Sequence, residues 1–321
     1  MTYSSGGLIQ ATDYNGFVST TVGANVNATW NSTYGQTALS TVSTAGTVSA
    51  TQWASLVNTI TNMAAHQPTT ITARSAPTTG TTISVLAAVN TDITNCFTNR
   101  YNAYAQGAQF TGWTGTNSKT AATSGASWTI TFTNTVTFAN ATAATNFFNS
   151  GGTVKIDVSK TATGALGDPE WNDLANTLCG DIYISGLATS HTIAGVAYTG
   201  TTKIGGTGTP TTLSTATGWD ALVDGAAATI VYKQFADTAP YTTNFIQHSI
   251  AKGASSTTLV ITTLWSANDA GPGVTDPISG GTAPSGATPG TAPCTIVTYY
   301  PPESVYLTNS WGTPTVAATT V

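Results

Sequence analysis

The spacing of apolar residues changes along this chain from a helical period to a strand period, and this change limits the folds open to it. From Thr51 to Gln67 the apolar residues lie three and four positions apart, on one face of a helix. This stripe consists of Trp53, Leu56, Val57, Ile60, Met63 and Ala64. A second helical pattern runs from about Ser84 to Gln106. Because threonine is a mediocre helix former, we expect the two helices to pack as a hairpin that buries both stripes.

After Gln106 the pattern is typical of strands. From Trp128 to Phe138 large apolar residues alternate with threonine, which predicts a strand with one buried face. A short helix capped by Asn140 and a strand over 154–158 follow, and Asp168-Pro169 begins a further helix. Later β-rich runs cover 182–187, 192–198, 229–235, 241–250, 257–265, 294–300 and 304–308. The predicted fold class is therefore α+β, with an N-terminal helical hairpin followed by an antiparallel β-sandwich-like region.

Three regions follow from this organisation. Residues 1–110 form a helical docking region, 111–187 a mixed α/β region, and 188–321 a β-rich outer domain. Glycine and proline are frequent over 268–293, which we interpret as an extended loop. The tail from Trp311 to Val321 is predicted to be an arm that docks on a neighbouring molecule.

Charged residues are scarce. They make up 7% of the chain, against roughly 25% in ordinary soluble proteins, and threonine alone supplies about a fifth. Neutral, short side chains are inexpensive to desolvate and to order, so we expect neighbouring subunits to cover much of the surface. A solitary, threonine-rich secreted adhesin is the alternative.

Several classes of partner are disfavoured. The net charge is −5 and the eight basic residues are scattered singly, so a nucleic-acid interface is not expected. No apolar run approaches the roughly 20 residues that span a bilayer, so we expect no membrane insertion. The start of the chain lacks the basic flank and apolar core of a signal peptide. A product made in the host cytoplasm and released in a virus particle reconciles these features.

Catalytic signatures are also lacking. Cys96, Cys179 and Cys294 form no metal-binding or disulfide pattern, and the first two are interpreted as buried free thiols. The histidines are isolated, and the only glutamates, Glu170 and Glu303, do not mark a catalytic pair. We therefore predict no enzyme and no cofactor. An enzyme that depolymerises surface polysaccharide is a disfavoured alternative.

One weak metal candidate remains. Asn268, Asp269 and Asp276 in the glycine-rich loop could supply oxygen ligands to calcium, although their spacing is not that of an EF-hand. Ordinary loop residues are the simpler interpretation. Aromatic residues in the β region could form a sugar platform, but in alternating strands they more often belong to a core.

Short motifs in a fixed order resemble a family of virion structural proteins from tailed phages that infect cyanobacteria and other aquatic bacteria. The motifs lie between Tyr34 and Asn172. They are Tyr34-Gly35-Gln36, Val48-Ser49-Ala50-Thr51-Gln52-Trp53, His66-Gln67, Phe147-Phe148-Asn149-Ser150-Gly151-Gly152 and Glu170-Trp171-Asn172. The resemblance does not extend further along the chain, and it brings no catalytic residues.

The resemblance implies a non-enzymatic, homo-oligomeric building block of the particle that contacts other virion proteins. The expected position is the tail, baseplate or fibre junction. The alternatives are a neck, collar or head-surface decoration protein, or a receptor-binding tail protein that recognises host-surface glycan. The candidate interface residues are Tyr34, Gln36, Trp53, His66, Gln67 and Trp311.

Overall fold

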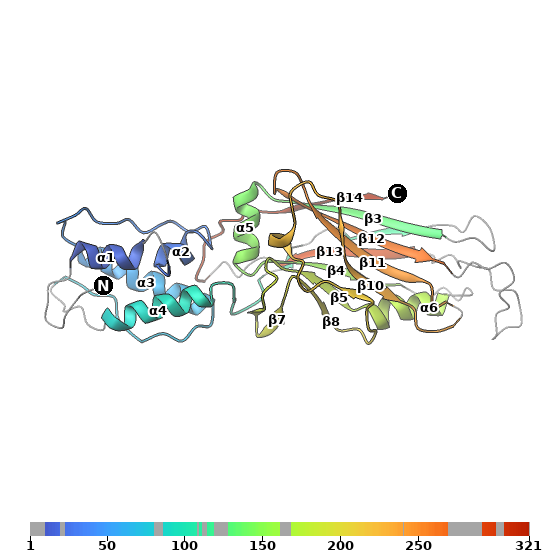
Figure 1. Ribbon diagram of the computed structural model, residues 1–321, viewed down its shortest axis with the longest axis horizontal. Coiled ribbons are helices and arrows are strands. Elements are labelled where there is room, and N and C mark those ends of the chain that lie inside the picture. Colours follow the sequence, from blue (N-terminus) through green and yellow to red (C-terminus); the bar gives the residue numbers. More distant parts are fainter. Residues whose placement is uncertain are drawn as a thin grey trace, which may run out of the picture.

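The fold combines α-helices with antiparallel sheets, in agreement with the predicted α+β class. A computed structural model describes residues 10–19, 23–79, 86–107, 109–110, 114–118, 128–160, 168–239, 241–268, 291–299 and 305–320. Figure 1 shows an elongated molecule with helices α1 to α4 gathered at one end and the long strands at the other. Helix α5 lies where these two lobes meet (Figure 1).

Four helices build the helical lobe. They are α1 (Ala11–Val18), α2 (Val26–Trp30), α3 (Ala50–His66) and α4 (Leu86–Thr98). Helix α3 begins with a capping box, because Ser49 Oγ accepts from the Gln52 backbone N–H at 3.2 Å and Gln52 Oε1 accepts from the Ser49 N–H at 2.8 Å. The predicted apolar stripe of α3 is buried from end to end.

Trp53 shows why α1 joins this lobe. Its ring meets Tyr14 edge to face at 5.6 Å and Phe17 at 6.1 Å, so α1 covers the start of α3. Such aromatic pairs contribute about 1 kcal/mol each beyond simple burial. Helix α3 also contacts α4. The hairpin itself stays a prediction, because part of its connection, residues 80–85, lies outside the described residues.

Helix α4 ends earlier than predicted. The pattern that extends to Gln106 on sequence is helical only to Thr98. Beyond it, Ala103 bridges to Ile193 and the Tyr104 N–H donates to His66 O at 2.7 Å. The chain leaves the helix because these backbone groups find partners in the β lobe and at the end of α3.

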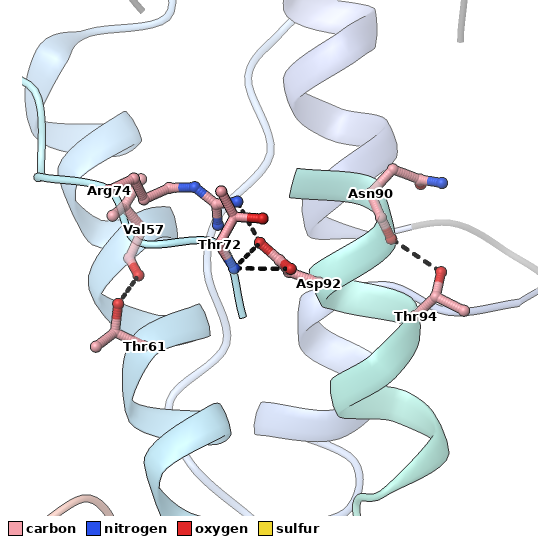
Figure 2. Close-up of polar contacts among 7 residues, drawn as sticks. All are labelled: Val57, Thr61, Thr72, Arg74, Asn90, Asp92 and Thr94. Carbon is pink, nitrogen blue, oxygen red and sulfur yellow. Dashed lines mark hydrogen bonds and ion pairs between the residues drawn. The ribbon is translucent and has the colours of Figure 1, made fainter. Parts of the chain in front are cut away.

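A buried ion pair fixes the connector after α3 to α4 (Figure 2). Arg74 contacts Asp92, and the exposed fractions of their side chains are only 7% and 3%. The Thr72 N–H donates to both Asp92 carboxylate oxygens at 3.2 Å. Removal of either charge would leave the other buried and unpaired, so this pair holds the connector in place.

Threonine is accommodated inside these helices by bonding back to the preceding turn. Thr61 Oγ1 donates to Val57 O at 3.0 Å in α3, and Thr94 Oγ1 donates to Asn90 O at 2.9 Å in α4 (Figure 2). A hydroxyl that bonds the carbonyl four residues earlier needs no other partner. Thr61 and Thr94 are thus satisfied within their own helices, whereas the buried hydroxyl of Thr29 in α2 has no hydrogen-bond partner within the described residues.

Two six-stranded antiparallel sheets form the β lobe. The first sheet has the order β1 (Gln109–Phe110), β13 (Thr291–Tyr299), β4 (Thr153–Val158), β5 (Asp181–Ile184) and β8 (Thr201–Ile204), and β2 (Thr114–Ser118) also pairs with β13. The second sheet has the order β14 (Thr315–Thr320), β3 (Trp128–Thr137), β12 (Thr258–Ala267), β11 (Phe245–Lys252), β10 (Thr229–Phe235) and β9 (Thr212–Leu213).

The predicted boundary at 187/188 does not separate two folded units. Strand β3 pairs with β12 and β14, and β4 pairs with β13. Both sheets therefore mix strands from the segments 111–187 and 188–321. Pairing between distant segments cannot be read from local composition, which explains the difference.

Helices connect the two sheets. Helix α5 (Ala141–Asn149) begins at Asn140, whose Oδ1 accepts from the Ala143 N–H at 2.8 Å, and Phe147 and Phe148 pack on Phe138. The short 3₁₀ helix η2 (Trp219–Ala221) places Trp219 against Phe148.

Helix α6 (Asp168–Asp173) continues into the π-helix η1 (Leu174–Cys179), which contacts β4 of the first sheet and β10 and β11 of the second. The Tyr232 hydroxyl of β10 donates to Cys179 O at 3.0 Å. One apolar core thus spans both sheets and these helices. A β-sandwich in the strict sense stays a prediction.

Other local differences concern turns and the tail. Residues 192–198, predicted as one strand, form the hairpin of β6 (His191–Ile193) and β7 (Val196–Tyr198), because Ala194 and Gly195 turn the chain with φ of 53° and 77°. The predicted loop 268–293 gives way to β13 at Thr291. Residues 305–308, predicted as a strand, are not one.

Candidate functional site

Segments far apart in the sequence meet at the junction between the two lobes. The junction comprises the Tyr34-Gly35-Gln36 loop, the end of α3 at His66-Gln67, the end of α5 and residues 308–311. One other motif quoted for the resemblance, His66-Gln67, thus contacts the Tyr34-Gly35-Gln36 loop. The part played by residues 308–311 could not be predicted, since nothing local in that segment indicates its partner.

Tyr34 is the centre of this junction. Its hydroxyl donates to Arg100 O at 2.7 Å and accepts from Gln67 Nε2 at 2.7 Å, while its backbone oxygen accepts from Ser310 Oγ at 2.6 Å. Burial raises the pKa of Tyr34 well above its usual range, and the bond from Gln67 offsets this only in part. The hydroxyl is therefore a neutral structural donor, unsuited to acid–base work near neutral pH.

Gln36 ties the tail of the chain to the helical lobe. Its Nε2 donates to Thr308 O at 2.9 Å, and its Oε1 accepts from the Thr308 N–H at 3.0 Å and from the Thr308 hydroxyl at 2.7 Å. The Gln36 amide thus bonds the backbone N–H and C=O of Thr308 in the way that a neighbouring β-strand would. These contacts hold residues near 308 at the junction.

Gly35 allows the loop to approach α5. Its φ is +66°, and a Cβ at this position would overlap the side-chain amide of Asn146 and lie 2.9 Å from Ser310 Oγ. Only glycine meets both conditions without strain. The loop and α5 are therefore in direct contact at this position.

His66 lies beneath the loop, among aromatic rings. Its ring meets Tyr34 edge to face at 5.0 Å and Tyr104 at 6.5 Å, and neither ring nitrogen has a hydrogen-bond partner within the described residues. Burial lowers the pKa of His66 to about 4. The imidazole is neutral and packs as an aromatic side chain.

The structure corrects the list of candidate interface residues. Side chains that bind a partner must reach the surface, whereas all of these are at most 3% exposed inside a single chain. They are Tyr34, Gln36, Trp53, His66, Gln67 and Trp311. Trp53 packs inside the helical lobe, and the other five residues belong to the internal junction between the lobes.

The tail is also internal. Trp311 is fully buried, its backbone N–H donates to Asn309 Oδ1 at 3.1 Å, and the segment after it forms β14 on the edge of the second sheet. The arm predicted from Trp311 to Val321 therefore docks on its own chain. Thr-Val-Ala-Ala-Thr-Thr lacks a clear strand period, and the segment becomes a strand through its pairing with β3.

The calcium candidates gain no support. Asn268 uses its side chain and backbone locally, because its N–H donates to Asn244 Oδ1 at 2.8 Å and its Nδ2 donates to Thr243 O at 3.4 Å. Asp269 and Asp276 lie outside the described residues. Across the described ranges, histidine, cysteine and carboxylate side chains form no group of metal-binding size.

The thiols within the described ranges are buried, as predicted. Cys96 and Cys179 are free, and burial raises the pKa of each to about 12. A protonated, inaccessible thiol is a poor nucleophile. The side chain of Cys294 lies outside the described residues.

A polar cavity of about 290 Å³ opens beside the junction. The end of α4 and the loop before β6 line it, with Asn99, Arg100, Tyr101, Asn102, Ser190 and His191 among the lining residues. No carboxylate occurs among the described residues that line it. This site could not be predicted from the sequence, because residues near 100 and near 190 meet only in the folded chain, where Ala103 pairs with β6 and Asn102 Oδ1 accepts from the Thr192 N–H.

The outward face of the second sheet is nearly free of charged side chains within the described strands. Along β3 the residues between the buried apolar positions are half-buried or exposed threonines, and Thr315 of β14 pairs with the last of them. On β12 the outward positions alternate between threonine and apolar residues, namely Thr258, Val260, Thr262 and Leu264. The threonines of β3 are Thr129, Thr131, Thr133, Thr135 and Thr137. Lys233 on β10 is the one charged side chain on this face within the described strands, and it lies over the Phe235 and Phe245 rings at 4.6 and 3.7 Å.

No protein-family model, curated protein or solved structure matches the chain. None of the helices in the described ranges combines the length and apolar character that crossing a bilayer requires.

Proposed function

We propose that this chain is a non-enzymatic structural component of a larger assembly, in which copies of the chain contact one another and other proteins. Following the resemblance of its motifs, we propose a tailed-phage virion as that assembly, with the tail, baseplate or fibre junction as the position. A neck, collar or head-surface position is the alternative.

The main support for this proposal is the outward face of the second sheet. A partner that covers this face would displace water from threonine side chains, from the apolar side chains of Val260 and Leu264, and from only one charge, at Lys233. Desolvating neutral hydroxyls costs far less than desolvating charges, so the face is suited to permanent contact. Strand β14 at the end of this sheet adds an edge that lacks the lysine or proline with which many proteins protect edge strands.

The two lobes have separate roles in this proposal. The helical lobe, with its hairpin of α3 and α4, docks into the particle. The β lobe acts as a sandwich-like outer module and presents the threonine-covered face. The junction around Tyr34 fixes the position of one lobe relative to the other.

Mass spectrometry of purified particles tests the position of the protein. The chain should be present in intact particles at a fixed ratio to the other structural proteins. Its absence from particles would refute the virion proposal. Sedimentation of the purified chain tests the assembly separately, since a stable monomer at high concentration would refute self-association.

Receptor binding is a second candidate function, favoured by the polar cavity beside the junction. Hydroxyl and amide groups around a hollow of about 290 Å³ suit a host-surface glycan. A glycan array probed with the full chain tests this candidate, and a uniformly negative array would count against it.

A further inference from the structure

The cavity beside the junction has a positively charged side chain in its lining and no negatively charged one among the described residues. Arg100 lines it, and no aspartate or glutamate occurs among the described lining residues. Within the described part of the chain, Arg100 forms no ion pair. An unpaired guanidinium in a hollow makes that hollow attractive to anions.

The guanidinium of Arg100 is held in one orientation. Its Nη1 donates to Phe97 O at 2.5 Å, and its Cζ lies 4.0 Å from the Phe97 ring centroid and 4.5 Å from that of Tyr101. These contacts leave further N–H donors of the planar fork for a ligand. Little side-chain entropy would then be lost when a carboxylate binds.

The neutral groups of the cavity are also oriented. His191 Nδ1 lies 3.0 Å from Thr189 O, so Nδ1 carries the proton and Nε2 is an acceptor. Burial lowers the pKa of His191, which keeps the ring neutral at pH 7.

The lining asparagines are fixed in the same way. Asn102 Oδ1 accepts from the Thr192 N–H at 2.9 Å, and Asn99 Nδ2 donates to Thr69 Oγ1 at 3.1 Å. Each amide thus has one end held by the chain and the other end for a ligand. Alternating donors and acceptors of this kind match the hydroxyls of a sugar.

We propose that this cavity binds one carboxylate-bearing sugar unit, of the uronic-acid type, with Arg100 on the carboxylate and the asparagine and histidine side chains on the ring hydroxyls. A single full positive charge matches a monoanion, whereas phosphate sites usually gather several cations or N–H donors. The volume of about 290 Å³ suits one sugar ring. The inference deepens the receptor-binding candidate and is independent of whether the chain belongs to a particle.

Calorimetric titration of the full chain tests the proposal, with glucuronate, galacturonate, glucose and inorganic phosphate as probes. We expect a uronate to bind at least about tenfold more tightly than glucose or phosphate, because only the uronates engage both the guanidinium and the neutral groups. No uronate binding, equal binding of glucose, or tighter binding of phosphate would overturn the proposal.

Two variants and a matched control locate the site. Arg100→Gln should weaken uronate binding by about tenfold or more and leave glucose unchanged. Ser190→Trp, at an exposed position of the rim, should block the cavity. Ala226→Trp, which is also exposed and lines a different cavity of about 140 Å³, should bind uronate as the natural chain does. Uronate binding that survives both Arg100→Gln and Ser190→Trp would refute the site. That result would leave the virion proposal untouched, because the composition of purified particles tests it separately.

Discussion

The junction between the lobes and the outward face of the second sheet are built from the same kinds of side chain, yet they behave in opposite ways. At the junction Tyr34, Gln36 and Gln67 are buried, and their polar atoms find partners within the chain. On the outward face of β3, Thr131 and Thr133 remain partly exposed.

The comparison shows that a low content of charged side chains has two consequences. A neutral polar group can be buried cheaply once it is hydrogen-bonded, which permits a polar joint between lobes. The same neutrality lowers the cost for another molecule to cover the open face. Changes at the junction should therefore alter folding stability, and changes on the face should alter association.

Gly35→Ala should have the largest effect. The new methyl would overlap Asn146 and the residue would need a positive φ of 66°, so we expect a loss of about 3 kcal/mol in the free energy of unfolding. Urea denaturation measures it. Gly205→Ala is the matched control, because Gly205 has a φ of +72° with nothing within 4 Å of the added Cβ, and should lose only about 1 kcal/mol. Equal losses in the two variants would contradict the close approach at the junction.

Acidification should have the second largest effect, because it acts on His66 at the junction. The pKa of His66 is about 4 in the folded chain and about 6.5 when unfolded, so the unfolded state binds more protons between these values. The free energy of unfolding has its full value, as far as His66 is concerned, above pH 6.5. It falls as the pH is lowered toward 4, and the loss is about 2 kcal/mol at pH 5.

The free energy of unfolding against pH, for the natural chain and His66→Gln, isolates this contribution from other titrating groups. The variant should have the shallower slope between pH 6.5 and 4. Parallel curves would show that His66 is solvated in the folded state.

Tyr34→Phe should cost somewhat less. Loss of the hydroxyl leaves the Arg100 carbonyl and the Gln67 amide without this partner, at about 1 to 2 kcal/mol. Thermal unfolding measures it. Tyr104→Phe provides the control, since Tyr104 is 37% exposed and should change stability by less than about 0.5 kcal/mol. A Tyr34 variant as stable as this control would mean that the junction is held by packing alone.

Thr133→Glu should have the smallest effect on folding and a clear effect on association. The position lies on the outward face of β3, so we expect a change below about 0.5 kcal/mol in the stability of the monomer. Sedimentation should show weaker self-association, because a partner would have to desolvate a carboxylate. Thr142→Glu on the exposed side of α5 is the control. Identical association of both variants would move the interface away from this sheet.

Much of the fold follows from local pattern, and the junction shows where that stops. The stripe on α3, the cap at Asn140 and the alternation along β3 predict elements that the structure contains, because each depends on neighbours a few residues away. The early end of α4 and the split of 192–198 into a hairpin depend on contacts made by distant segments. Gln36 and Thr308 are far apart in sequence, so no local signal indicates that they pair.

Periodicity and composition are local properties, so the α+β class, most of the helices and strands and the scarcity of charge can be predicted from the amino-acid sequence. The division of neutral polar residues into internal and outward-facing ones arises in the folded chain. Strand pairing and the meeting of the lobes set that division, and both depend on contacts between residues far apart along the chain.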